Sequence, residues 1–240
     1  MGRTKITFLL IMTGLIVSLG LVSCLVDISH AAEPAAKASA AADIKTLAAD
    51  LKSGKTAVKL DAIRKLSQIK TRESAEALAE HFAVEQDPYV KRKMLKSMSV
   101  NQTTGTVKAV LSALEDPNPK VRQSAATELG YFDVNSREVV DALSNALKNE
   151  SNKGVTMGIV NTLGNSTEPG AVDTIEKTLK HKDKDIKKMA VRSLGGIGTK
   201  KALGVLEKNR NNPNDREMRE NIRQALNANR VKAAKEKKIK

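Results

Sequence analysis

The chain has 240 residues, a formal net charge of +14, two tyrosines, three phenylalanines and no tryptophan. The basic excess predicts attraction to anionic partners that weakens with salt, and the scarcity of aromatic rings argues against sites that stack bases or sugars. The single cysteine, Cys24, lies near the N-terminus, so the rest of the chain can form neither disulfides nor thiolate metal sites.

Residues 1–31 have the pattern of an export leader. Two basic residues precede an apolar run that carries no charge until Asp27. Three fates of this leader remain open. An ordinary signal peptidase could cleave after Ala31, or cleavage before Cys24 could be followed by lipidation of that residue, because Leu-Val-Ser-Cys resembles a lipobox. The segment could also stay as an anchor, because the run approaches the ~20 residues that span a bilayer. All three predict export or membrane insertion in a bacterium-like cell, and place the protein in the periplasm or cell envelope.

Residues 32–42 are rich in alanine and lack large apolar side chains, which predicts a linker. No comparable break interrupts residues 43–228, which we therefore expect to form one elongated domain.

Within residues 43–228 a unit of 31 to 34 residues recurs six times. Each unit carries an aliphatic anchor followed by apolar residues four and eight positions later. At ~100° per residue these positions lie on one face of a helix. The anchors are Val58, Val90, Val121, Val155, Ile186 and Met218.

Capping residues support these helices. Asp or Asn, both preferred N-cap residues, stand three positions before every anchor except the first, where Lys55 breaks the pattern. A further apolar residue about 11 or 12 positions before each anchor indicates a preceding helix with its own polar start. Those starts are Thr71, Thr103, Ser136, Thr167 and Thr199. A helix pair repeated at this period predicts an all-α solenoid.

The segments Leu114–Gly130 and His181–Gly198 resemble HEAT repeats of the short kind named after phycobilisome lyases. The resemblance covers about residues 40–228 and implies a right-handed superhelical stack of about six helix pairs. The family includes scaffolds, adaptors, chromophore lyases and DNA-repair glycosylases, so it does not decide the function. Two units depart from the family pattern. Thr156 stands directly after its anchor, where a basic residue is usual. Met98 and Ser99 stand where leucine followed by glycine is usual.

In the other five units a cation directly follows the anchor, on the edge of the apolar face. We expect its stem to cover the core and its head to pair with an acid or carbonyl of a neighbouring repeat. These cations are Lys59, Lys91, Arg122, Lys187 and Arg219.

Positions roughly opposite the core on the second helix of each pair carry no acid in any unit. The resemblance implies that the second helices line the concave surface of the stack. A basic concave surface would bind an acidic protein segment or an anionic polymer, although an ordinary solvated helix face explains the same pattern. The predicted partner-binding residues are Arg64, Arg92, Lys93, Lys96, Lys188 and Arg192.

No catalytic residue, metal site or cofactor motif stands out. His81 and His181 fall at the ends of first helices, where cations are favoured, and we expect both on the surface. No pair of histidines has metal-ligand spacing. Residues 195–198 are rich in glycine but end a helix, which indicates a turn rather than a phosphate loop.

Residues 229–240 contain six cations and one acid, which predicts a disordered, solvated basic tail. Such a tail could cap the open end of the solenoid or grip an anionic surface.

The sequence thus favours a monomeric, non-enzymatic interaction scaffold of the bacterial envelope, with an acidic protein or envelope polymer as its partner and a possible N-terminal membrane tether. A chromophore-lyase-like enzyme is the first alternative. A nucleic-acid-binding protein is less favoured, because export would separate it from nucleic acid.

Overall fold

The computed structural model describes residues 42–211 and 215–239. The predicted leader, its lipidation candidate Cys24 and nearly all of the alanine-rich linker therefore lie outside the described residues. The chain divides into two compact units, residues 1–47 and 48–240. Residues 42–47 of the first unit are helical. The solenoid belongs to the second unit.

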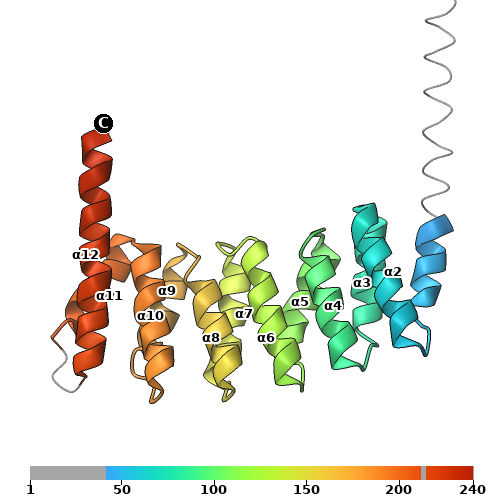
Figure 1. Ribbon diagram of the computed structural model, residues 1–240, viewed down its shortest axis with the longest axis horizontal. Helices are drawn as coiled ribbons and strands as arrows, with labels where there is room; N and C mark the ends of the chain where they lie inside the picture. Colours follow the sequence, from blue (N-terminus) through green and yellow to red (C-terminus); the bar gives the residue numbers. More distant parts are fainter. Residues whose placement is uncertain (1–41, 212–214, 240) are drawn as a thin grey trace, which may run out of the picture. The chain divides into compact units, whose positions relative to one another are not determined.

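The second unit consists of helix pairs (Figure 1). Its first helices are α3 (Arg72–Phe82), α5 (Thr104–Ser112), α7 (Arg137–Lys148), α9 (Pro169–Thr178) and α11 (Lys200–Asn209). Its second helices are α2 (Thr56–Ile69), α4 (Pro88–Met98), α6 (Pro119–Glu128), α8 (Lys153–Leu163), α10 (Lys184–Ile197) and α12 (Arg216–Ile239). Short 3₁₀ turns, η1 (Ala113–Glu115) and η2 (Leu129–Tyr131), extend α5 and α6. The described residues contain no strand.

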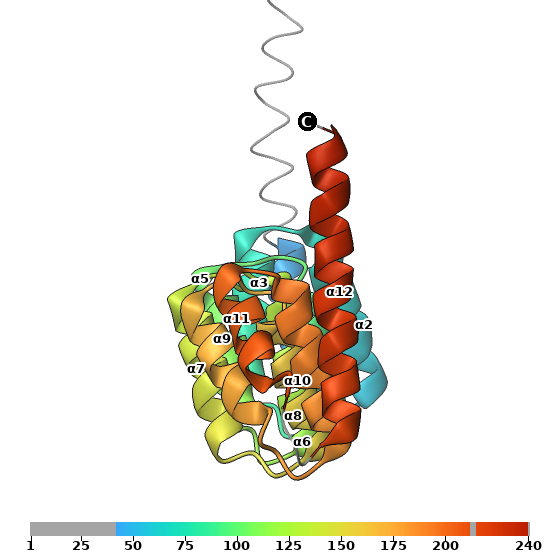
Figure 2. The same ribbon diagram turned by 90° about the vertical axis from the view of Figure 1, so that its left-hand side faces the viewer.

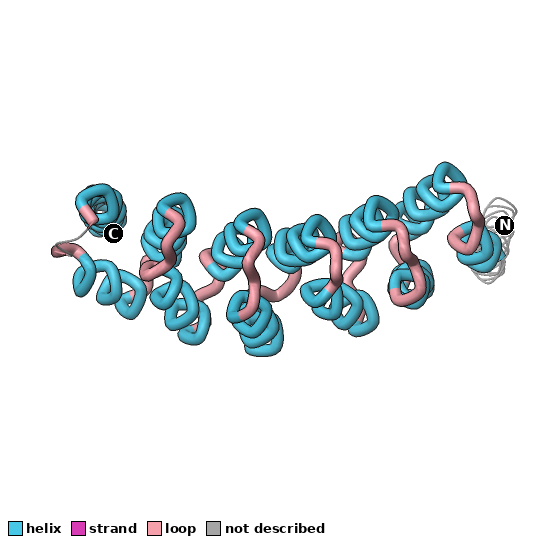
Figure 3. Tube along the Cα trace, turned by 90° about the horizontal axis from the view of Figure 1, so that it is seen from below, coloured by secondary structure: helices cyan, strands magenta, loops and turns pink. Residues whose placement is uncertain are grey.

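The helices form two layers. Figure 2 looks along the stack and shows the first helices on one side and the second helices on the other; Figure 3 shows the same two rows from below. Each second helix packs on the next, from α2 through α12, and α3, α7 and α9 likewise contact first-helix neighbours. The predicted all-α solenoid is confirmed.

The predicted apolar stripes form the core between the layers. All residues four and eight positions after the anchors are buried, and so are five of the six anchors; Val58 on α2 is half-buried. The apolar positions of the first helices, among them Leu78, Leu143 and Leu206, are buried against them. Burial of these aliphatic side chains on both layers supplies the main stabilisation of the stack.

The N-caps follow the predicted pattern, with one correction. All five predicted Asp and Asn caps of the second helices accept a backbone N–H of the first turn, and Lys55 makes no such bond. The correction concerns α9, which begins after Glu168 rather than after Thr167. Pro169 suits the first helical position because it needs no N–H partner there, and Thr167 instead donates to Asn135 at 3.1 Å.

Neighbouring second helices approach closely in the C-terminal half. A Cβ atom built on Gly164 would lie 2.7 Å from the Cβ atom of Ser193, so α8 and α10 could not keep this spacing with a larger residue there. The Ser193 hydroxyl donates to the carbonyl oxygen of Val160 at 3.1 Å, and Thr162 donates in the same way to Ala126 at 2.7 Å. These bonds fix the register of α6, α8 and α10.

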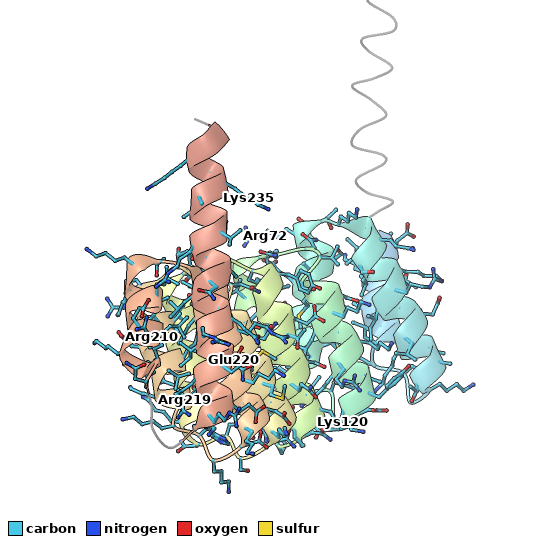
Figure 4. The ribbon with its side chains drawn as sticks, turned by 60° about the vertical axis from the view of Figure 1, so that its left-hand side comes forward. Arg72, Lys120, Arg210, Arg219, Glu220 and Lys235 are labelled. Carbon is cyan, nitrogen blue, oxygen red and sulfur yellow. The ribbon has the colours of Figure 1, made fainter. Side chains whose placement is uncertain are left out.

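The C-terminal residues differ from the prediction of a disordered tail. Helix α12 continues to Ile239, and Lys235 lies on the part that extends past the other helices (Figures 2 and 4). Alanine, lysine and glutamate in this stretch are strong helix formers, which outweighs the repulsion between like charges. Residues 230–237 are exposed, as expected for a basic, solvated segment. None of the described helices is both long and apolar enough to cross a membrane.

Candidate functional site: a basic face on the second helices

Four of the cations that follow the anchors are seen to form ion pairs between repeats, as predicted. We call each such pair a rung: Lys59–Glu85, Lys91–Asp116 and Arg122–Glu150, each at 2.7 Å, and Lys187–Asp215. The cationic side chains are 17–20% exposed, because their stems lie along the core. Rung cations therefore serve the structure, and a basic binding surface has to come from other residues.

The rung acids also hold the turns before the second helices. Glu85, Asp116 and Glu150 each accept the backbone N–H of the next N-cap residue, at 2.9, 2.8 and 2.7 Å. Burial raises the pKa of Glu150, but hydrogen bonds from Arg122 and from the Asn152 amide outweigh it and hold that pKa below its usual value. Glu150 is thus an ionised structural group.

One rung is open. Thr156 follows the anchor of α8 where the other units have a cation, and His181 stands where three of them have an acid. His181 Nδ1 accepts the Asp183 amide N–H at 3.0 Å, so the histidine keeps the hydrogen bond to the turn and lacks the ion pair.

The six predicted partner-binding residues are all exposed on second helices. We call the exposed side of α2, α4, α6, α8, α10 and α12 the second-helix face. Three of the predicted partner-binding residues, Arg64, Lys93 and Lys96, line one cleft, which we call the α2–α4 cleft. Arg92 points to the next helix and donates to Ser124 at 3.1 Å. Lys188 and Arg192 lie on α10, beyond α6 and α8, and form a separate basic group.

The α2–α4 cleft has a volume of about 400 Å³ and a mixed lining. Its apolar part comes from Leu60, Ile63 and two exposed residues, Tyr89 and Val100, which are 49% and 60% exposed. Ser67 and Ser97 add hydroxyl groups. Cations around an exposed apolar surface suit a ligand that carries both acidic and apolar groups.

The three cations of the cleft have different surroundings. Arg64 pairs with Asp61 at 2.5 Å, on the same helix. Lys93 Nζ lies 5.2 Å from the centre of the Tyr89 ring, a cation–π contact. The Lys96 side chain makes no hydrogen bond or ion pair with the described residues. Lys93 and Lys96 can therefore meet a ligand without losing an existing ion pair.

The middle of the second-helix face is neutral. Thr127 on α6 and Asn161 on α8 occupy the positions that Lys96 and Arg192 hold on α4 and α10. Glu220 on α12 adds an acid, paired with Arg223 at 2.6 Å. At this helical position, cations therefore occur on α2, α4 and α10 and are absent from α6 and α8.

His81 corrects a prediction. The sequence placed it on the surface at the end of α3, but its side chain is 10% exposed and its Nε2 atom has no hydrogen-bond partner among the described residues. That atom lies 3.7 Å from Glu85 Oε2. Burial lowers the pKa of His81, although the Glu85 carboxylate opposes the shift. His181 is half-buried, so it too is not a fully exposed surface residue.

The glycine-rich residues 195–198 behave as predicted. Helix α10 ends there, and Gly198 has a φ of 64°, the left-handed conformation of a helix C-terminus. Within the described part of the chain no group of three or more His, Cys, Asp or Glu side chains is arranged to hold a metal ion.

Comparison with known families agrees with this architecture. The family model of HEAT repeats matches residues 107–177 and 159–227, which together span half of the chain. The chain belongs to the HEAT-repeat family. A search of curated proteins finds no significant match.

Solved structures of other repeat proteins are similar in fold. The TOG3 domain of Drosophila melanogaster Mini spindles is 14% identical with a TM-score of 0.55, over 76% of this chain and 92% of that one. A designed armadillo repeat protein in complex with the peptide (KR)4 is 19% identical with a TM-score of 0.51, over 76% and 98%. The CpcE–CpcF complex of phycocyanin lyase from Nostoc sp. PCC7120 is 14% identical with a TM-score of 0.38, over 77% and 94%. The first two show the fold alone, and the third is too distant to carry an argument.

Proposed function

We propose that this HEAT-repeat protein is a non-enzymatic interaction scaffold that binds an acidic protein segment on its second-helix face. The observation that carries the proposal is the α2–α4 cleft, where three cations surround an exposed apolar surface. An acidic segment would approach the basic face rapidly, because complementary charge raises the association rate more than the affinity. Affinity would come from burial of Tyr89 and Val100.

The composition of the cleft favours an acidic peptide over a simple anionic polymer. Tyr89 and Val100 are two of only a few large apolar side chains exposed on the described surface. A polymer of charged groups alone would leave them in contact with water, whereas a peptide can place one apolar side chain between them and its acids against Lys93 and Lys96. The basic group on α10 would then hold a more distant part of the same segment.

The proposal includes export to a bacterial periplasm or envelope. Its support is the leader pattern of residues 1–31, with either a soluble mature chain or a lipid tether at Cys24. The lyase-like and nucleic-acid-binding alternatives have no feature among the described residues that favours them over a binding scaffold.

The test uses a short fluorescein-labelled peptide rich in glutamate, with one leucine at its centre, and measures fluorescence anisotropy at several salt concentrations. The variant Lys93→Glu/Lys96→Glu changes two exposed cations of the cleft. We expect it to bind about tenfold more weakly and with less salt dependence, since two favourable exposed charge pairs become repulsive.

A matched control reverses two exposed lysines on first helices, Lys108→Glu/Lys200→Glu, which changes the net charge by the same amount. The control should bind nearly as tightly as the natural chain. Equal weakening by both variants would mean that only net charge matters and would overturn the cleft assignment. A third variant, Tyr89→Ser, should weaken the peptide with the central leucine and leave an all-glutamate peptide unchanged.

A further inference from the structure

The open rung coincides with a cavity among the described residues. This cavity, the α7–α9 pocket, has a volume of about 520 Å³ and lies between two first helices, with Thr156 and His181 in its wall. In the preceding rung the side chain of Arg122 reaches Glu150. Threonine is too short to reach across in the same way, so the exchange of cation and acid for Thr156 and His181 leaves space.

Thr156 has an unusual hydroxyl group. The residue is 3% exposed, yet its hydroxyl makes no hydrogen bond to any described residue. Every other buried Ser or Thr side chain in the described part of the chain is hydrogen-bonded; Thr162, Thr178 and Ser193, for example, donate to backbone carbonyls. Among the described residues His81 Nε2 is the one fully enclosed side-chain polar atom without a partner, so the Thr156 hydroxyl keeps access to the pocket, where it is a donor that the fold does not use.

His181 supplies a second donor. Its Nδ1 atom accepts the Asp183 N–H, and in the neutral imidazole the proton must then be on Nε2. The histidine therefore presents an N–H group whose tautomer is fixed by the turn. Because the side chain lines the pocket, that group is available to a ligand together with the Thr156 hydroxyl.

The charges of the pocket favour an anion. Lys148, Lys177 and Lys180 line it against two acids, Asp141 and Glu150, an excess of one positive charge with His181 neutral. Glu150 is already engaged, since it accepts from Arg122 and from the Asn152 amide. Asp141 lies 3.6 Å from Arg137. Unused donors therefore outnumber unused acceptors.

The size of the pocket suits a small organic ligand, because its volume lies within the roughly 300–1,000 Å³ of small-molecule pockets. Most of its lining residues are polar. Leu147 contributes apolar surface, and the Ser144 and Thr174 hydroxyls, 2.8 Å apart, connect α7 to α9. A carboxylate with a carbon chain can fill such a volume, whereas inorganic phosphate would leave most of it empty.

We propose that the α7–α9 pocket binds a small organic carboxylate, whose oxygens accept hydrogen bonds from the Thr156 hydroxyl and from His181 Nε2. The three lysines of the lining attract the anion, and Leu147 contacts its carbon chain. This site lies among first helices and is separate from the acidic-segment site on the second-helix face.

The histidines allow a direct test, because His30 lies in the leader and leaves two in the rest of the chain. The imidazole nitrogen resonances of the ¹⁵N-labelled protein are followed by NMR while glutarate, inorganic phosphate or an N-acetyl, C-amide glutamyl tripeptide is added. We expect saturable shifts at His181 Nε2 with glutarate and none at His81. Equal affinity for phosphate and glutarate would overturn the proposal of a small carboxylate ligand. A response to the tripeptide but not to glutarate, or no saturable response at all, would overturn it too.

Two variants separate binding from folding. Thr156→Val removes the hydroxyl at nearly constant volume and should weaken glutarate about fivefold, the effect of one lost hydrogen bond. Thr156→Lys/His181→Glu rebuilds a rung on the pattern of Lys59–Glu85, fills the pocket and should abolish glutarate binding. Binding of the labelled acidic peptide should be unchanged in both variants, so failure at one site is distinguishable from failure at the other. Unchanged glutarate affinity in the rebuilt variant would overturn the assignment.

Discussion

The closed rung Lys91–Asp116 and the open rung Thr156–His181 occupy the same place in two repeats and serve different purposes. Both provide an acceptor for the N–H of the N-cap residue, at 2.8 and 3.0 Å. Only the closed rung carries an ion pair. Its counterpart has an unpartnered hydroxyl beside a cavity of about 520 Å³ instead.

The difference shows that the two tasks of a rung acid are separable. Accepting the turn N–H requires one lone pair, which imidazole supplies as well as carboxylate. Pairing with the cation requires charge, which neutral imidazole lacks. A repeat can therefore keep its turn while it gives up its ion pair, and the space of the missing cation becomes available for binding. Stability in a solenoid depends on each repeat and its neighbours, so the remaining rungs can support such an exception.

The largest effect is expected when the two rungs are broken at equivalent positions. Asp116→Ala removes both the hydrogen bond to the turn and the partner of the half-buried Lys91, and should destabilise the protein by about 2–4 kcal/mol. His181→Ala removes only a hydrogen bond and should cost about 1 kcal/mol. Urea unfolding followed by circular dichroism, fitted with a nearest-neighbour scheme for repeats, measures both.

Asp133→Ala is the matched control for this pair. Asp133 accepts the Asn135 backbone N–H at 3.1 Å, is exposed, and forms no ion pair with a described residue. Its loss should cost less than about 1 kcal/mol. Equal costs for Asp116→Ala and His181→Ala would mean that the rungs stabilise the turns alone and that the ion pair contributes nothing.

The second prediction closes the open rung. Thr156→Lys/His181→Glu should raise the free energy of unfolding by about 1 kcal/mol, since it adds a partly buried ion pair and removes an unpartnered hydroxyl. Each single variant should be less stable than the natural chain, because it leaves one charge without its partner. The double-mutant cycle from urea unfolding gives the coupling energy directly. A coupling energy of zero would show that the two positions do not interact across the turn.

Much of this comparison could be predicted from the sequence, because it depends on helical spacing. The anchors, the caps and the structural role of the cations all follow from fixed offsets within one helix, and Thr156 was recognisable as a departure at such an offset. The acid of each rung could not be recognised from the sequence, because it lies in a loop 25 to 28 residues after its cation, where the spacing varies. The role of His181 and the existence of the pocket depend on that loop.

The binding face was predicted in part for the same reason. Spacing identified Arg64, Lys93 and Lys96 as outward-facing, but it could not show that they share a cleft with Tyr89 and Val100, which requires the packing of α2 against α4. Tyr89, one of two tyrosines in a chain poor in aromatic residues, was the available signal. His81 was misplaced because helix-end charge preference says nothing about the neighbouring turn that covers it. The tail of α12 was misplaced because charge was weighed above helix propensity.

The smallest expected effect is on the pH dependence of stability, and it distinguishes the first rung, Lys59–Glu85, from the others. His81 lies beside the rung acid Glu85, while Ser112 and Ala146 take the equivalent positions near Asp116 and Glu150. Burial lowers the pKa of His81 below 6.5, with Glu85 opposing the shift and Lys59 and Lys52 adding to it. The unfolded chain therefore binds this proton more readily than the fold does, and stability should fall as the pH drops from about 7 toward about 5.5.

Glu85 does not obscure this window. Burial raises its pKa, but hydrogen bonds from Lys59 and from the backbone amides of Asp87 and Gln86 outweigh burial and hold it below 4.5. Its contribution is therefore lost only at lower pH. His81→Leu should reduce the loss of stability between about pH 7 and about pH 5.5, measured as the change in urea midpoint, while Ser112→Leu should leave that loss unchanged. An unaltered pH dependence in His81→Leu would mean that the buried imidazole takes up its proton as easily in the fold as in the unfolded chain, and that the first rung is no different from the second.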